Sequence, residues 1–314
     1  MQATSTNEMT KKEWLLERRK GIGGSDVATV LGLNKYSSPY QLWLDKTGQL
    51  DIDESDVSEA AHFGNILEEV VAKEFTERTD KRGRRANKIF RHADYPFLNA
   101  NIDRAIVGED AILECKTAST YLSDRWEGEE IPEQYICQVQ HYLNVLDKQF
   151  AYIAVLIGGQ KFVWKKIERD QELIDIIQER LVEFWEVNVK QGIAPAIDGS
   201  NATEDYIKER YAHSESGKEI TLKKSIDGLI EKRTELQETK KIVEESIKEI
   251  DNQLKTELGE QDAEIGISPK FVISWKPIET TRINSKKIKK EAPELYEQYS
   301  STSLSRRLSI KEIK

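Results

Sequence analysis

The sequence contains few cysteines and no long apolar run. Cys115 and Cys137 are its only cysteines; two are too few for a disulfide scaffold, and they lack the Cys-x-x-Cys spacing of structural zinc sites. No apolar stretch approaches the ~18 residues that a membrane span requires. Residues 1–14 also lack the basic-then-apolar order of a signal peptide. These absences predict a cytoplasmic protein without disulfides, structural zinc or membrane contact.

Charge is plentiful but unevenly distributed. The 47 Lys+Arg against 56 Asp+Glu give a formal net charge of -9, which disfavours nucleic acid because cations must neutralise its phosphates. Residues 78–91, however, carry seven basic side chains and one acid, and residues 270–314 carry eleven basic and five acidic ones. Such runs are either solvated surface or local DNA-binding surfaces on an acidic body.

The apolar pattern of residues 1–198 predicts helices first and strands afterwards. Helices are expected over 10–20, 25–31, 38–48, 58–78, 132–146 and 171–190. Strands are expected over 89–92, 98–106, 111–116, 150–157 and 161–167. This order predicts a mixed α/β domain.

The remaining chain is predicted to hold a long helix and a small basic module. Apolar residues at alternating steps of three and four predict a helix over 219–258, ~60 Å long at ~1.5 Å per residue. Arg233 and Lys240 interrupt its apolar seam, which either packs on this chain's own body or pairs with another copy or a partner. We therefore expect a linker and long helix over 199–260 and a basic strand-helix module over 261–314.

Three polar residues on two predicted strands form the candidate catalytic cluster. Glu114 and Lys116 lie two residues apart on one strand and point to one face, and a hairpin at 107–110 can bring Asp103 beside them. Neighbouring carboxylates repel each other, and a hard cation such as Mg²⁺ holds both ionised. The cluster is either a metal site that polarises a phosphodiester or a chance triplet on an exposed hairpin. The apolar residues 111–113 indicate a buried strand, where a carboxylate is costly.

The sequence resembles the PD-(D/E)xK nucleases, and within them the phage alkaline exonucleases of the lambda exonuclease and YqaJ-type viral recombinase group. The resemblance spans about residues 14–195. It depends on five blocks in the family's order: ERRKGIGGSDVATVLG, FGNILEE, NIDRA, ILECK and ICQVQHYL. It implies a restriction-endonuclease-like core, a mixed sheet flanked by helices, as a nuclease domain over 1–198. One departure is Ile102, which stands where the superfamily often has proline.

The resemblance implies a role for each residue of the cluster. Asp103 and Glu114 would bind metal together with the backbone carbonyl of Cys115, and Lys116 would position the attacking water. Two Mg²⁺ ions are implied, with Mn²⁺ as a substitute.

Two helices are implied to contribute further residues. Glu68 matches the family's helix glutamate, which completes a second metal site, and Glu69 is the competing candidate. Gln138 and Tyr142 match the superfamily's Q-x-x-x-Y pattern one helical turn apart, with Gln140 as the alternative to Gln138. A surface-facing glutamate and an ordinary packing helix are the structural alternatives.

Arg18 and Ser25 match the arginine and serine with which this family holds the terminal 5′-phosphate. A glycine turn that ends at Gly24 leaves backbone amides accessible at a helix start, and a guanidinium adds a charge-assisted contact. Arg19 and Lys20 are alternatives to Arg18, and a plain N-cap after the turn is the structural alternative.

The resemblance thus implies a Mg²⁺-dependent exonuclease that digests double-stranded DNA 5′ to 3′ and leaves a 3′ single strand for recombination by annealing. Implied partners are DNA ends with a 5′-phosphate, a single-strand annealing protein and further copies of the chain in a trimeric ring, in the host cytoplasm of a phage or prophage-bearing bacterium. Arg82, Arg84 and Arg85 would face the DNA. The residues alone also allow an endonuclease or nickase on the same core, or a catalytically silent DNA-binding scaffold.

Overall fold

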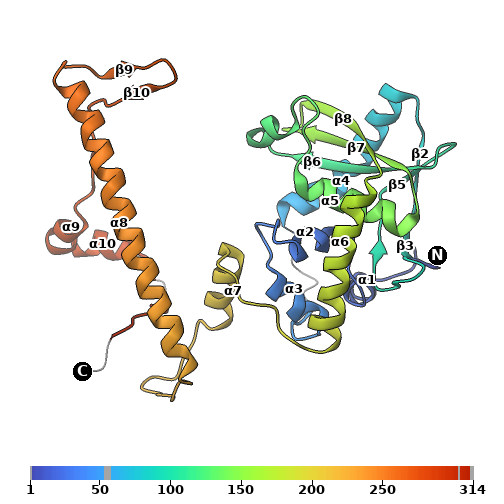
Figure 1. The fold of residues 1–314 in the computed structure, drawn as a ribbon, viewed down its shortest axis with the longest axis horizontal. Coiled ribbons are helices and arrows are strands. Elements are labelled where there is room, and N and C mark those ends of the chain that lie inside the picture. Colours follow the sequence, from blue (N-terminus) through green and yellow to red (C-terminus); the bar gives the residue numbers. More distant parts are fainter. Residues whose placement is uncertain (1, 53–57, 303–304, 312–314) are drawn as a thin grey trace. The chain divides into compact units, whose positions relative to one another are not determined.

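The computed structural model describes residues 2–52, 58–302 and 305–311. The chain forms two compact units that divide between Tyr211 and Ala212 (Figure 1). The first unit includes helix α7 (Asn201–Arg210), which lies in the range expected to be a linker. Helix α7 belongs there because its Ala202 and Thr203 are buried.

A five-stranded mixed sheet forms the centre of the first unit. Its order is β2-β5-β6-β7-β8, and only the β6–β7 pair is parallel. The strands are β2 (Gly83–Arg85), β5 (Arg104–Ile106), β6 (Ala111–Ala118), β7 (Phe150–Ile157) and β8 (Lys161–Glu168). A parallel pair needs a crossover, which here carries a 3₁₀ helix over Thr120–Trp126 and helix α5 (Glu133–Leu146). The expected mixed sheet flanked by helices is confirmed.

A second sheet, of three short strands, corrects one expectation. It contains β1 (Gln2–Ser5), β3 (Lys88–Arg91) and β4 (Asn99–Ala100) in the order β1-β3-β4. The single strand expected over 98–106 is therefore two strands, β4 and β5, in different sheets. The chain breaks between them because Asn99 N–H donates to the carbonyl of Ile22 and Ile22 N–H donates to that of Phe97, which ties β4 to the glycine turn.

Helices cover both faces of the central sheet. They are α1 (Lys11–Arg19), α2 (Gly24–Val30), α3 (Pro39–Lys46), α4 (Glu59–Thr79), α5 and α6 (Gln171–Glu183), the last continuing as a π-helical turn over Phe184–Lys190. Phe75 of α4 packs with Leu113 and Tyr152 on one face. Leu143 of α5 packs with Ile112 on the other. Alternate residues of β6 thus enter separate cores.

Helix α2 begins one residue earlier than predicted. Gly23, not Ser25, is its N-cap residue, and the carboxylate of Asp26 accepts a hydrogen bond from Gly23 N–H at 3.0 Å. The third helical residue, Asp26, thus satisfies an amide at the helix start, which leaves the Ser25 hydroxyl available for other contacts.

The second unit contains one long helix and a small α+β segment. Helix α8 (Ser225–Gly259) begins six residues later than predicted. It is followed by a hairpin of β9 (Ile265–Ile267) and β10 (Val272–Ser274) and by α9 (Ser285–Glu291) and α10 (Pro293–Tyr299). The one helix expected in the basic module is two helices, because Pro293 lacks a backbone N–H and begins the second. No helix in the described parts of the chain is long and apolar enough to cross a membrane.

Candidate active site

The two strands β5 and β6 bring the three predicted catalytic residues together. Asp103 directly precedes β5, and its Oδ2 accepts a hydrogen bond from the Cys115 backbone N–H at 2.7 Å. On β6, Lys116 Nζ donates to Glu114 Oε1 at 2.6 Å, so these two side chains share a face. Glu114 is only 3% exposed, which rules out a solvated hairpin.

Helix α5 adds Gln138 to this group. Gln138 Nε2 donates to Glu114 Oε1 at 2.7 Å, and Gln138 Oε1 accepts from Lys116 Nζ at 3.1 Å. We call Asp103, Glu114, Lys116 and Gln138 the carboxylate cluster. The competing Gln140 contacts other groups, because its amide donates to the carbonyl of Glu168 at 2.7 Å. Gln138 is thus the glutamine at the site.

Burial and mutual repulsion set the electrostatics of the carboxylate cluster. Burial raises the pKa of Asp103 well above its usual value, and the nearby charge of Glu114 raises it further. Burial alone would lower the pKa of Lys116, but the charges of Glu114 and Asp103 hold it above its usual value. Glu114 Oε2 is buried without a hydrogen-bond partner. A buried carboxylate oxygen is costly in that state, so the cluster fits a divalent cation.

Glu68 of α4 lines the same cavity as Asp103, Glu114 and Lys116. In this structure its carboxylate is bound by the guanidinium of Arg104, which also donates to Glu69 at 2.8 Å. Within the described residues, no three acidic, histidine or cysteine side chains converge closely enough to hold a metal ion.

Arg104 was not identified from the sequence as a site residue. It is 3% exposed, and besides the two glutamates it contacts the carbonyl of Asp103 at 2.9 Å. Its position directly after Asp103 in the NIDRA block is the one signal that could have indicated it.

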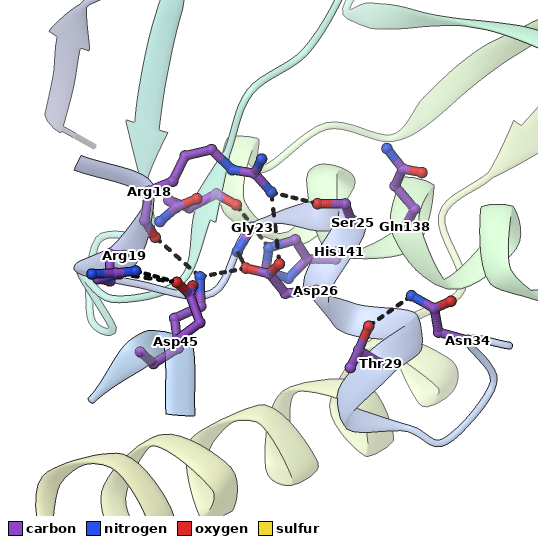
Figure 2. A network of polar contacts seen from close by, with 12 residues as sticks. Arg18, Arg19, Gly23, Ser25, Asp26, Thr29, Asn34, Asp45, Gln138 and His141 are labelled. Atoms are coloured by element: carbon purple, nitrogen blue, oxygen red, sulfur yellow. Dashed lines mark hydrogen bonds and ion pairs between the residues drawn. The ribbon is translucent and has the colours of Figure 1, made fainter. Parts of the chain in front are cut away.

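The glycine turn and α2 place Arg18 against Ser25. Arg18 Nη2 donates to Ser25 Oγ at 2.7 Å, and Figure 2 shows the guanidinium extended toward that hydroxyl. Arg19 points elsewhere and binds Asp45 at 2.9 Å, and Lys20 pairs with a carboxylate on its own helix. Of the three basic candidates, Arg18 is the one that reaches Ser25.

A buried ion pair beneath Arg18 fixes this region. Lys46 Nζ lies 2.7 Å from Asp26 Oδ2 and donates to the carbonyl of Arg18 at 3.1 Å. Burial would raise the pKa of Asp26, but the charges of Lys46 and Arg18 lower it below its usual value. The main chain at Arg18 is thereby held to α2.

Gly24 connects the Arg18–Ser25 pair to the carboxylate cluster. A Cβ atom on Gly24 would overlap the ring of Tyr142, so only glycine permits this approach of α2 to α5. The Tyr142 hydroxyl accepts from Gln138 Nε2 at 3.1 Å, and Gln138 in turn contacts Glu114. A chain of contacts through Gly24, Tyr142 and Gln138 thus links these two groups from different parts of the sequence.

The three predicted DNA-facing arginines lie at or beside β2, an edge strand of the central sheet. All three are exposed. Arg85 lies 3.4 Å from the carboxylate of Glu68.

The central mixed sheet with helices on both faces makes the first unit a mixed α/β domain. Residues 13–149 match the YqaJ-like viral recombinase domain, and the chain is 52% identical over 309 residues to the uncharacterized protein YqaJ of Bacillus subtilis (strain 168), covering 98% of this chain and 96% of that protein. The chain belongs to the YqaJ-like viral recombinase family.

Two solved structures are also similar. The alkaline exonuclease LHK-Exo of Laribacter hongkongensis has a TM-score of 0.49 and 18% identity, over 58% of this chain and 95% of that one. A phage-related exonuclease from Haemophilus somnus 129PT has a TM-score of 0.41 and 15% identity, over 55% and 96%.

Proposed function

We propose that this protein is a Mg²⁺-dependent deoxyribonuclease that digests duplex DNA from its ends, 5′ to 3′, and leaves a 3′ single strand for recombination by annealing. The observation that carries the proposal is the contact path Gly24–Tyr142–Gln138–Glu114, which joins an arginine suited to a phosphate with a buried carboxylate cluster suited to a metal. Membership of a viral recombinase family supports the same role.

Asp103, Glu114 and the carbonyl of Cys115 would hold the metal, and Glu68 would complete a second site. The bound metal would polarise the phosphodiester and lower the pKa of the attacking water. Lys116 remains a cation beside Glu114, and it can orient that water and offset charge that develops on the phosphate. Gln138 contacts both Glu114 and Lys116, and so it would keep the metal ligand and the group that orients the water at a constant distance from each other.

Arg18 and Ser25 would bind the terminal 5′-phosphate. A guanidinium forms paired, charge-assisted hydrogen bonds with phosphate, and the Ser25 hydroxyl that Arg18 now contacts can donate to the same oxygen. The exposed Arg82, Arg84 and Arg85 would contact the backbone of the duplex. Further partners in this proposal are a single-strand annealing protein and further copies of the chain in a trimeric ring, within the host cytoplasm.

One assay separates this function from its rivals. Linear and closed circular duplexes, each with a labelled 5′ or 3′ strand where ends exist, are incubated with Mg²⁺. An exonuclease of the proposed polarity degrades only linear DNA and releases the 5′ label first. Cleavage of both substrates would identify an endonuclease or nickase, and cleavage of neither would identify a scaffold. Replacement of Mg²⁺ by Mn²⁺ or by a chelator tests the metal.

Arg18→Ala tests the phosphate contact directly. We expect the variant to digest 5′-phosphorylated linear duplex at least tenfold more slowly, with a much smaller effect on 5′-hydroxyl duplex, because only the first substrate offers the charge that the guanidinium pairs with. Lys20→Ala is the matched control, since it removes a neighbouring exposed cation that pairs with Glu17. Equal slowing of Arg18→Ala on both substrates would contradict a phosphate-binding role.

A further inference from the structure

Helix α8 exposes an apolar stripe along most of its length. The residues of this stripe recur at steps of three and four, or of seven where Arg233 and Lys240 stand between them: Ile226, Leu229, Leu236, Val243, Ile247, Ile250 and Leu254. From Leu229 to Leu254 these side chains are 38% to 64% exposed, and only Leu258 of the helix is buried. A stripe with this spacing is the seam of a coiled coil, and exposed apolar patches of this kind mark interaction surfaces.

Two basic residues in the seam disfavour a parallel pair of identical helices. Arg233, Lys240, Ile247 and Leu254 follow one another at steps of seven and so occupy the same seam position in successive heptads. In a parallel pair each seam residue faces its own counterpart, so Arg233 would face a second Arg233, with Lys232 beside it. Like charges in that arrangement repel.

An antiparallel pair of the same helices places both basic residues beside acids. When the two-fold axis passes between Lys241 and Ile242, Arg233 lies beside Asp251 of the second copy and Lys240 beside its Glu244. The apolar residues also match in this register, because Leu229 meets Leu254.

The length of the overlap selects this register. A shift of one heptad toward the N-terminus leaves Arg233 beside an acid but Lys240 without one, and a shift toward the C-terminus places Arg233 opposite Glu257 and Lys240 beside Asp251. Either shift shortens the paired segment of α8. The axis also falls beside the midpoint of α8, which runs from Ser225 to Gly259, so the paired segment is ~50 Å long at ~1.5 Å per residue.

We propose that α8 pairs with α8 of a second copy of this chain in an antiparallel coiled coil. Within one chain, Lys240 lies 3.5 Å from Glu244 of its own helix and is 73% exposed, and Arg233 donates to Gln237 at 2.9 Å. Both side chains are therefore at the surface, where a second helix can share them. The contact lies outside the nuclease site and does not depend on its activity.

The test is the mass of the full-length protein in solution, measured by sedimentation. The variant R233E/K240E places acids against Asp251 and Glu244, and the variant E244K/D251K places bases against Arg233 and Lys240. Each variant alone should have half the mass of the unaltered protein, because loss of the α8 pair separates the two copies. An equimolar mixture should regain the full mass, because every charge pair across the helices is then restored.

The control variant is K241E/K248E, which makes the same change in charge on the outer side of α8 and should keep the full mass. The proposal is overturned if R233E/K240E keeps the mass of the unaltered protein, which is the result expected if α8 packs on its own first unit. It is equally overturned if the mixture does not regain mass or if the control variant also dissociates.

Discussion

Each acid of the carboxylate cluster is held by a different kind of neighbour. Asp103 accepts a main-chain hydrogen bond, whereas Glu114 contacts an ammonium and an amide through one oxygen and leaves the other without a partner. Such a site stores an unfavourable charge interaction that a cation relieves. The sequence identifies the three charged residues because their spacing fits a hairpin, but Arg104 could not be recognised without its ion pairs.

Asp103→Asn should reduce cleavage by on the order of 10² to 10³ or more, because the amide cannot supply the negative charge that a metal needs. The variant should fold, since its side-chain oxygen still accepts from the Cys115 N–H. Initial rates at saturating Mg²⁺ and the melting temperature check both statements. Asp110→Asn, on the same hairpin but 58% exposed at its side chain, should keep its rate; near-normal turnover of Asp103→Asn would refute the site.

His141 should make the fold sensitive to mild acid. It is 1% exposed, its Nε2–H donates to the carbonyl of Asn99 at 2.9 Å, and burial lowers its pKa to about 4. In the unfolded chain the pKa of the histidine is ~6.5, so below that pH the unfolded chain binds a proton that the folded protein does not. The folded protein therefore keeps its full stability above that pH and loses free energy of unfolding as pH falls toward 4. The loss is on the order of 3 kcal/mol.

Urea unfolding of the protein and of His141→Gln between pH 7 and 4, at ~0.5-unit steps, measures this effect. The free energy of unfolding should fall less steeply in the variant, because a glutamine side chain carries no titrating group while its amide can still donate to Asn99. Parallel curves for the two proteins would show that His141 does not cause the acid sensitivity.

At the scale of elements, strong apolar periodicity was sufficient to predict the main helices and the strands β6, β7 and β8 from the sequence. Strand β2 was missed because Gly83–Arg85 is short and polar and forms only through pairing with β5. Helix α7 was missed because only two of its residues are buried. The break between β4 and β5 depends on the bridge to Ile22, which is distant in sequence.

The approach of α2 to α5 predicts the effect of Gly24→Ala. A methyl group would overlap the Tyr142 ring, and relief of the overlap must separate the helices or move Tyr142 away from Gln138. We expect a loss of roughly 1–3 kcal/mol in unfolding free energy and a fall in cleavage rate at saturating metal. Gly199→Ala, with no atom within 4 Å of the added carbon, should change neither; an unaltered rate in Gly24→Ala would contradict the coupling of the two groups.

At the scale of the whole molecule, every residue of the proposed active site lies in the first unit. Truncation after Tyr211 should therefore retain metal-dependent hydrolysis, whereas an earlier end would remove α7 with its buried Ala202 and Thr203. If the basic residues of the second unit contact DNA, the truncated protein should bind more weakly. Its slope of log affinity against log salt should then shrink by about 0.9 per lost phosphate contact. An unchanged slope would show that the second unit makes no phosphate contacts, and would leave assembly as its role.

The packing of Gly24 on Tyr142 also has a consequence for how the enzyme would advance along a strand. Because α2 and α5 meet without an intervening side chain, the residues that would hold the strand terminus cannot drift relative to those that would cut it. The distance between the phosphate-binding residues and the cutting residues would therefore stay constant. Under the proposed function, each turnover would remove a segment of one fixed size, and the strand itself would then have to slip forward by that step before the next cut.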